Sequence, residues 1–182
     1  MVTAAEAPGQ GVLSVAGEPA EAYRLRLPFH APPLTANDAR RGGTGHYHSQ
    51  SRAKRDVAAA VVAVVRHARV PHLDRLRLRL VWYAPDYARR DCSALQVMLK
   101  ACEDALTPPR AAIPKGTIGK TTGKPREKGV PAKLGVGIID DDHAGILVET
   151  AMAIELGCAD PRIELELYPL PPAPPRAARR RR

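Results

Sequence analysis

Length, composition and charge place this chain among basic globular proteins. It has 182 residues, 45% of them hydrophobic, so it can build one domain with a core and leave residues over for tails. Lys and Arg number 28 against 19 Asp and Glu, and the net charge of +9 favours phosphate polymers or anionic membrane surfaces as partners. No apolar run approaches the roughly 20 residues of a membrane span, the N-terminus lacks a secretory pattern, and three cysteines without a CxxC pair indicate reduced thiols in a cytosolic protein.

Both ends of the chain have the composition of tails. Residues 1–20 are rich in Ala, Gly, Pro and Glu, and they predict a flexible leader. Residues 171–182 are Pro-rich and end in clustered Arg, so they predict a disordered tail that either solubilises the protein or contacts phosphates. We therefore expect residues 21–170 to form the single folded domain.

The first half of this domain predicts a strand, a helix and a second strand. Residues 23–27 alternate apolar side chains with Arg, which indicates a strand, and a Pro- and Gly-rich loop follows. Residues 51–68 carry valines at helical spacing, with Ser51 as the expected N-cap. Residues 75–83 form the clearest strand, with apolar side chains on one face and mainly arginines on the other.

The second half predicts a helix, a long irregular stretch and two strands. We expect the helix from Ser93 to Leu106, with a buried stripe made by Leu95, Leu99, Cys102 and Leu106. Residues 107–137 lack periodicity and are rich in Lys, which predicts a flexible basic flap that can lie along a phosphate backbone. Strands are expected at 147–156 and 163–167, and the glutamates of the last strand can pair across the sheet with the arginines of 75–83.

Taken in order, these elements predict a fold of the α/β or α+β class. It is a small mixed β-sheet with two main helices on one face and the element order β-α-β-α-β-β. The alternation of apolar and charged residues along the strands indicates that helices cover only one face of the sheet.

Two groups of acidic residues follow apolar runs or basic pairs. Asp91 follows Arg89-Arg90 at the start of the second predicted helix, and Asp140-Asp141-Asp142 follows Ile138-Ile139. Taken singly, Asp91 is explained by the helix N-terminus, which favours a carboxylate, and the triple acid by a solvated turn. Crowded carboxylates repel one another unless a cation joins them, and their oxygens suit Mg²⁺, Mn²⁺ or Ca²⁺. Together, in a basic chain, the two groups predict a metal-assisted phosphodiesterase.

Three segments of the chain resemble the RusA-type Holliday junction resolvases. Residues 89–106 resemble the central motif of that family, which has a basic pair, Asp-x-Asp-Asn-Leu, a Lys and then Asp-Ala/Gly-Leu. Residues 139–142 resemble its apolar-Asp-Asp turn, and residues 32–37 its Pro-Pro…Asn loop before the first helix. The resemblance extends over residues 23–168, which is most of the expected domain.

The resemblance implies a small α/β homodimer that uses Mg²⁺ or Mn²⁺ to cut symmetrically placed strands of four-way DNA junctions. By position it implies that Asp91, Asp141 and Asp142 hold the metal and that Asp91, Lys100 and Asp142 are catalytic, while Asp104 matches an acid further along the helix. The residues expected to contact DNA have basic or amide side chains: Asn37, Arg40, Arg41, Arg89, Arg90, Lys115, Lys120, Lys124 and Lys128.

The chain departs from the family pattern in two places. Ser93 stands where the family has its second motif Asp, and Ala94 stands where it has Asn. A neutral hydroxyl is a weak Mg²⁺ ligand, so this loss predicts lower metal affinity unless Asp140 or Glu103 compensates. Residues 107–137 are an insertion where family members commonly have only a few residues, and they are expected to clamp DNA or to alter substrate choice.

The sequence thus predicts a divalent-metal-dependent, structure-selective DNA endonuclease that resolves four-way junctions in recombination and repair. We expect it in the cytoplasm, with the nucleoid when it is bound to DNA. The alternative is a catalytically impaired RusA-like protein that binds junctions. A single-strand-binding module is disfavoured because the chain has only one Phe, one Trp and five Tyr for stacking. A membrane-surface role is disfavoured because the Arg-rich tail has no neighbouring apolar helix face.

Overall fold

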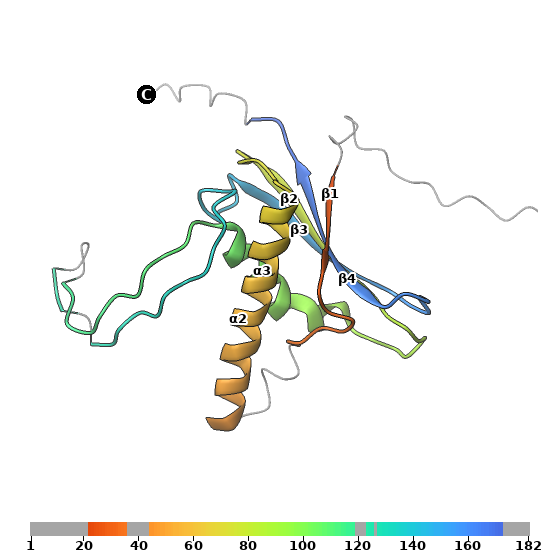
Figure 1. Cartoon of the computed structure of the whole chain (residues 1–182), viewed down its shortest axis with the longest axis horizontal. Helices are drawn as coiled ribbons and strands as arrows, with labels where there is room; N and C mark the ends of the chain where they lie inside the picture. Colours follow the sequence, from red (N-terminus) through yellow and green to blue (C-terminus); the bar gives the residue numbers. More distant parts are fainter. Residues whose placement is uncertain (1–21, 36–43, 119–122, 126, 173–182) are drawn as a thin grey trace, which may run out of the picture.

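The computed structural model describes residues 22–35, 44–118, 123–125 and 127–172 (Figure 1). The predicted leader and nearly all of the predicted tail therefore lie outside the described residues. Along the chain the elements are strand β1 (Tyr23–Leu27), helix α2 (Thr44–His67), strand β2 (Leu76–Tyr83), the 3₁₀ helix η1 (Cys92–Leu95), helix α3 (Gln96–Leu106), strand β3 (Leu147–Glu155) and strand β4 (Arg162–Pro169).

The strands form one mixed sheet in the order β1-β4-β2-β3. β4 pairs antiparallel with β1 on one side and with β2 on the other, whereas β2 and β3 are parallel. Parallel neighbours need a long crossover connection, and here η1, α3 and the following long segment supply it. The predicted class, a small mixed sheet with two main helices, is confirmed.

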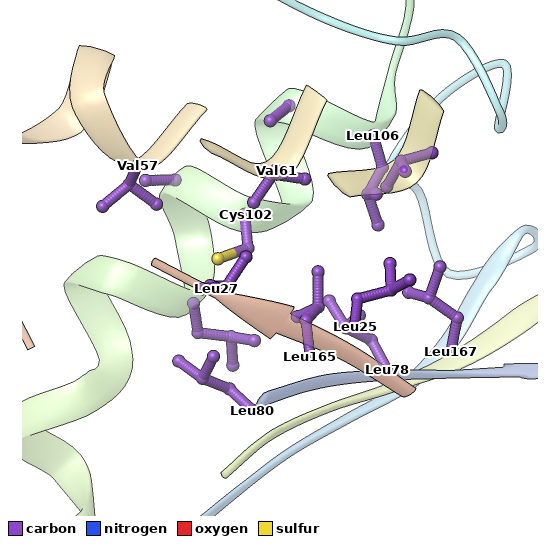
Figure 2. Close-up of a cluster of buried hydrophobic side chains, with 14 of the residues drawn as sticks. Leu25, Leu27, Val57, Val61, Leu78, Leu80, Cys102, Leu106, Leu165 and Leu167 are labelled. Carbon is purple, nitrogen blue, oxygen red and sulfur yellow. The ribbon is translucent and has the colours of Figure 1, made fainter. Parts of the chain in front are cut away.

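The core lies between the sheet and the two helices. Figure 2 shows leucines of β1, β2 and β4 meeting valines of α2 and the apolar side of α3. The predicted stripe of the second helix is confirmed, because all four of its members are buried. Burial raises the pKa of the Cys102 thiol to about 12, so this cysteine acts as an apolar core residue and not as a reactive thiolate.

Helix starts were the least accurate part of the prediction. Helix α2 begins at Thr44, so Ser51 lies inside the helix and the prediction that it is the N-cap is wrong. The helix extends through a polar segment that has no apolar periodicity to reveal it. The second helix begins as the 3₁₀ turn η1, capped by Asp91, and becomes α-helical only at Gln96.

Ion pairs cover the face of the sheet that no helix contacts. Glu166 is only 2% exposed, and its carboxylate lies 3.8 Å from Nε of Arg24 and 3.4 Å from Nη1 of Arg79. The Tyr168 hydroxyl donates a hydrogen bond of 2.7 Å to the same carboxylate. The predicted pairing is confirmed for Arg79 and Glu166. Arg77 instead pairs with Glu149 of β3 at 2.7 Å, and Arg75 donates to the Pro171 carbonyl at 2.8 Å.

The described residues within 107–137 form a long arm that leaves the domain at the C-terminal end of α3 (Figure 1). The prediction of an irregular flap missed its pairing: isolated antiparallel bridges join Arg110 to Lys133, Ile113 to Val130 and Ile118 to Pro125. At the base of the arm, backbone N–H groups of residues 136–138 donate to the carbonyls of residues 105–107. These bonds satisfy carbonyls that the end of a helix leaves without partners. None of the helices in the described residues is long and apolar enough to cross a membrane.

Candidate functional site

The triple-acid turn is anchored by the two isoleucines that precede it. Ile138 and Ile139 are buried, and their N–H groups donate to the Leu106 carbonyl at the end of α3. The Ile138 carbonyl in turn accepts from the Leu73 N–H at 2.7 Å. Asp140 and Asp141 are exposed, so the buried Ile138-Ile139 pair places their carboxylates at the surface.

Lys100 is the centre of a group of charged residues on α3 and the triple-acid turn. Its Nζ bonds to Oδ2 of Asp142, which lies 42 residues further along the chain. It also lies 3.5 Å from Glu103 and 3.4 Å from Asp104, one turn further along the same helix. Asp104 has a second cationic neighbour, because Nζ of Lys133 in the arm lies 3.4 Å from Oδ1. We call these five residues the Lys100 cluster.

The pKa values within the Lys100 cluster follow from these contacts. Burial lowers the pKa of Lys100, but the hydrogen bond that Lys100 donates to Asp142 and the charges of Asp104, Asp142 and Glu103 outweigh it, so the pKa is raised. The hydrogen bond from Lys100 holds the pKa of Asp142 below its ordinary value. Burial raises the pKa of Glu103, and the neighbouring Lys100 only partly offsets this. Lys100 is therefore a stable cation, and Asp142 a stable anion, at neutral pH.

The cluster is negative although the chain as a whole is positive. Two lysines face three carboxylates, so the Lys100 cluster has a net charge of −1 before the neighbouring Asp140 and Asp141 are counted. A phosphate that approaches this surface is repelled unless a cation joins the carboxylates or one of them takes up a proton.

Asp91 occupies a different position, at the start of η1. Its Oδ1 accepts the Ser93 N–H at 2.8 Å, and its Oδ2 accepts the Ser93 hydroxyl, also at 2.8 Å. The RusA-type pattern has a second acid at position 93. Here Ser93 stands at that position and donates to the Asp91 carboxylate instead. That Asp91 shares a metal ion with Asp142 stays a prediction.

The basic pair before Asp91 divides into an exposed and a bound arginine. Arg90 donates to both oxygens of Asp86, at 2.5 Å and 2.9 Å, and its guanidinium lies 4.7 Å from the centre of the Trp82 ring. The hydrogen bond from Arg90 lowers the pKa of Asp86 to about 2. Arg89 is exposed. Of the two, Arg89 is the more accessible to a phosphate.

The described residues do not form a ready-made metal site. Within the described part of the chain, no three Asp, Glu, His or Cys side chains are arranged so that they could hold a metal ion. Asp142 is bonded to Lys100, and Oδ1 of Asp141 accepts the Asp142 N–H at 2.8 Å. A divalent ion held by the predicted ligands Asp91, Asp141 and Asp142 would have to displace Lys100 from Asp142 or bind Asp142 together with Lys100.

The structure brings together only some of the residues that the sequence singled out. Lys100 contacts Asp142 and Asp104. Lys115, Lys124 and Lys128 are exposed on the arm, whereas Asn37, Arg40, Arg41 and Lys120 lie outside the described residues. Lys133 was not among the predicted site residues, because nothing in the local sequence shows that this arm residue returns to α3.

Comparison of the sequence with protein-family models and with curated proteins found no match in either. The resemblance to RusA-type resolvases therefore stays a hypothesis.

Proposed function

We propose that the protein is a RusA-like, divalent-metal-dependent endonuclease that acts on four-way DNA junctions. The observation that carries this proposal is the juxtaposition of the Lys100 cluster and the basic arm. Residues 107–137 leave α3 directly beside the cluster, and Lys133 at the base of the arm is bonded to Asp104 within it.

The charges of the two features are complementary in the way that such an enzyme needs. The exposed lysines of the arm attract a DNA backbone without reading its sequence. The Lys100 cluster repels phosphate until its negative charge is reduced. A nuclease that requires a cation to admit the scissile phosphate has this combination of a basic binding surface and an acidic centre.

Lys100 and the acids beside it have different roles in this proposal. Lys100, whose raised pKa keeps it charged, donates to a phosphate oxygen once Asp142 has found another cation. Glu103 and Asp104 hold the Lys100 side chain across the helix surface. A two-fold homodimer would place one such site on each of two strands of a two-fold junction.

A second function, junction binding without cleavage, is favoured by a specific observation. Both carboxylate oxygens of Asp91 accept bonds from Ser93, and Asp142 is neutralised by Lys100. Carboxylates that already have such partners give less free energy to a metal ion. Under this alternative the protein keeps the arm and the dimer but has lost the chemical step.

Cleavage of a synthetic four-way junction in Mg²⁺ or Mn²⁺ tests the two functions. The endonuclease proposal expects paired nicks by the wild-type protein, none by Asp142→Asn, and normal nicks by Asp160→Asn. Asp160 is a suitable control because it is also an ion-paired surface aspartate, bonded to Arg26 at 2.8 Å.

Absence of nicks at every metal concentration, in a folded sample that binds the junction, would reject the enzyme and leave the binding protein. The double variant Ser93→Asp, Ala94→Asn then decides whether catalysis was lost. If the variant cleaves, the protein is a decayed nuclease.

A further inference from the structure

We infer that Tyr87 is a stacking platform for one unpaired nucleobase, a role that rests on the proposed action on branched DNA. Tyr87 is 82% exposed, the highest value among the exposed large hydrophobic residues of the described chain. It lies in the loop between β2 and η1, four residues before Asp91. The ring is therefore available to a ligand from solvent.

One side of the Tyr87 ring is supported by the backbone of the β3–β4 turn. A Cβ atom at Gly157 would lie 2.3 Å from Cζ and 2.5 Å from the hydroxyl oxygen of Tyr87, so the ring lies directly against Gly157 and a larger residue there would displace it. Gly157 also has a φ of +69°, which glycine adopts without strain. With one side supported and most of its surface open, the ring can accept a flat partner.

The loop that carries Tyr87 is held in place on both sides of the ring. The Gly157 N–H donates to the Asp86 carbonyl at 3.0 Å, and the Cys158 N–H donates to the Ala84 carbonyl at 2.8 Å. The Asp86 carboxylate accepts the Ala88 N–H at 2.9 Å, in addition to its pair with Arg90. The backbone that carries the ring is therefore held in place before any ligand binds, which lowers the entropy cost of stacking.

The surroundings favour a nucleobase over an apolar protein side chain. Arg89 is exposed two residues from the ring and can contact the phosphate beside a stacked base. In Figure 1 the loop lies at the end of the domain opposite the basic arm, so a polyanion can contact both. η1 and α3 separate the Tyr87 loop from the base of the arm by roughly 24 Å, at about 1.5–2 Å per residue. This length equals about seven base-pair steps of about 3.4 Å.

A single ring of this kind suits a branch point better than a single-stranded tract. Continuous single strands need several stacking rings, which this chain lacks, whereas the centre of a four-way junction offers a few bases with incomplete stacking. Tyr87 would hold one such base while the lysines of the arm contact one duplex of the junction.

The test uses a four-way junction with 2-aminopurine at the branch point, in EDTA so that no cleavage occurs. We expect the wild-type protein and Tyr87→Phe to change the 2-aminopurine fluorescence and to bind equally well. Tyr87→Ala should lose that change and bind the junction on the order of 10-fold more weakly, the size of one base–aromatic stack. Its affinity for a fully paired duplex should stay the same. Val148→Ala, which also truncates an exposed apolar residue, should behave as wild type.

The inference is overturned if Tyr87→Ala retains the fluorescence change, or if it loses affinity for junction and duplex to the same extent. A single-stranded 2-aminopurine oligonucleotide separates this result from a failure of the proposed function. If the wild-type protein neither nicks nor prefers junctions but still changes the signal of that oligonucleotide through Tyr87, the stacking site stands and the junction endonuclease does not. If neither probe gives a signal that depends on Tyr87, the stacking site is refuted.

Discussion

Replacement of Asp142 by Asn isolates the contribution of its charge to the Lys100 cluster. The amide oxygen can still accept from Nζ, so the substitution removes the charge while keeping the shape of the side chain. Asp142 is 27% exposed and Lys100 is 56% exposed, so solvent screens their attraction. We therefore expect a loss of about 0.5–1 kcal/mol in the free energy of unfolding, the upper part of the range for surface pairs.

For a domain of this size, such a loss lowers the melting temperature by about 1–4 °C. Thermal unfolding followed by circular dichroism at pH 7 and low salt measures it. Asp140→Asn is the matched control, because Asp140 is 81% exposed and Nε2 of the His72 imidazole lies as far as 4.0 Å from its Oδ1. The control should melt at the wild-type temperature.

The pH and salt dependence identify the cause. Lys100 lowers the pKa of Asp142, so the pair stabilises the fold above the unfolded value of about 3.9 and ceases to do so as the pH falls through the lower, folded value. The difference between wild type and Asp142→Asn should be constant from pH 7 to 5 and shrink below about pH 4. It should also shrink at about 1 M salt, where the Debye length is about 3 Å. A difference that is unaffected by salt and by acid would refute the charge argument.

Two further predictions concern the arm. Replacing Lys115, Lys124 and Lys128 together by Ala should weaken DNA binding equally for duplex and junction. The slope of log K against log salt should fall by up to about three, or about 0.9 per phosphate contact. An unchanged slope would mean that the arm does not contact the DNA backbone. Gly135→Ala should lower the melting temperature, because its Cβ would lie 2.1 Å from the Thr107 carbonyl oxygen, and overpacking of this kind costs about 1–3 kcal/mol. An unchanged melting temperature would show that the base of the arm yields freely.

The strands and the buried face of α3 could be predicted because their signals are local. Alternation along residues 75–83 and the spacing of Leu95, Leu99, Cys102 and Leu106 each reflect one face turned toward a core. The start of α2 could not be predicted, since a polar segment that extends a helix leaves no periodic pattern. The 3₁₀ turn η1 was missed for a similar reason: the spacing of apolar residues does not distinguish its geometry from the first turn of an α-helix.

The candidate site divides in the same way. Lys100, Glu103 and Asp104 are one turn apart, so their proximity follows from the helix alone. Three other contacts join residues that are 29 to 70 positions apart: Lys100 with Asp142, Lys133 with Asp104, and Tyr87 with Gly157. By itself the sequence determined which segments are regular and which faces are apolar, because those depend on the few neighbours within a turn or a strand. Only the tertiary structure decided which charges and rings meet, because that depends on how the crossover through α3 and the arm returns the chain to the sheet.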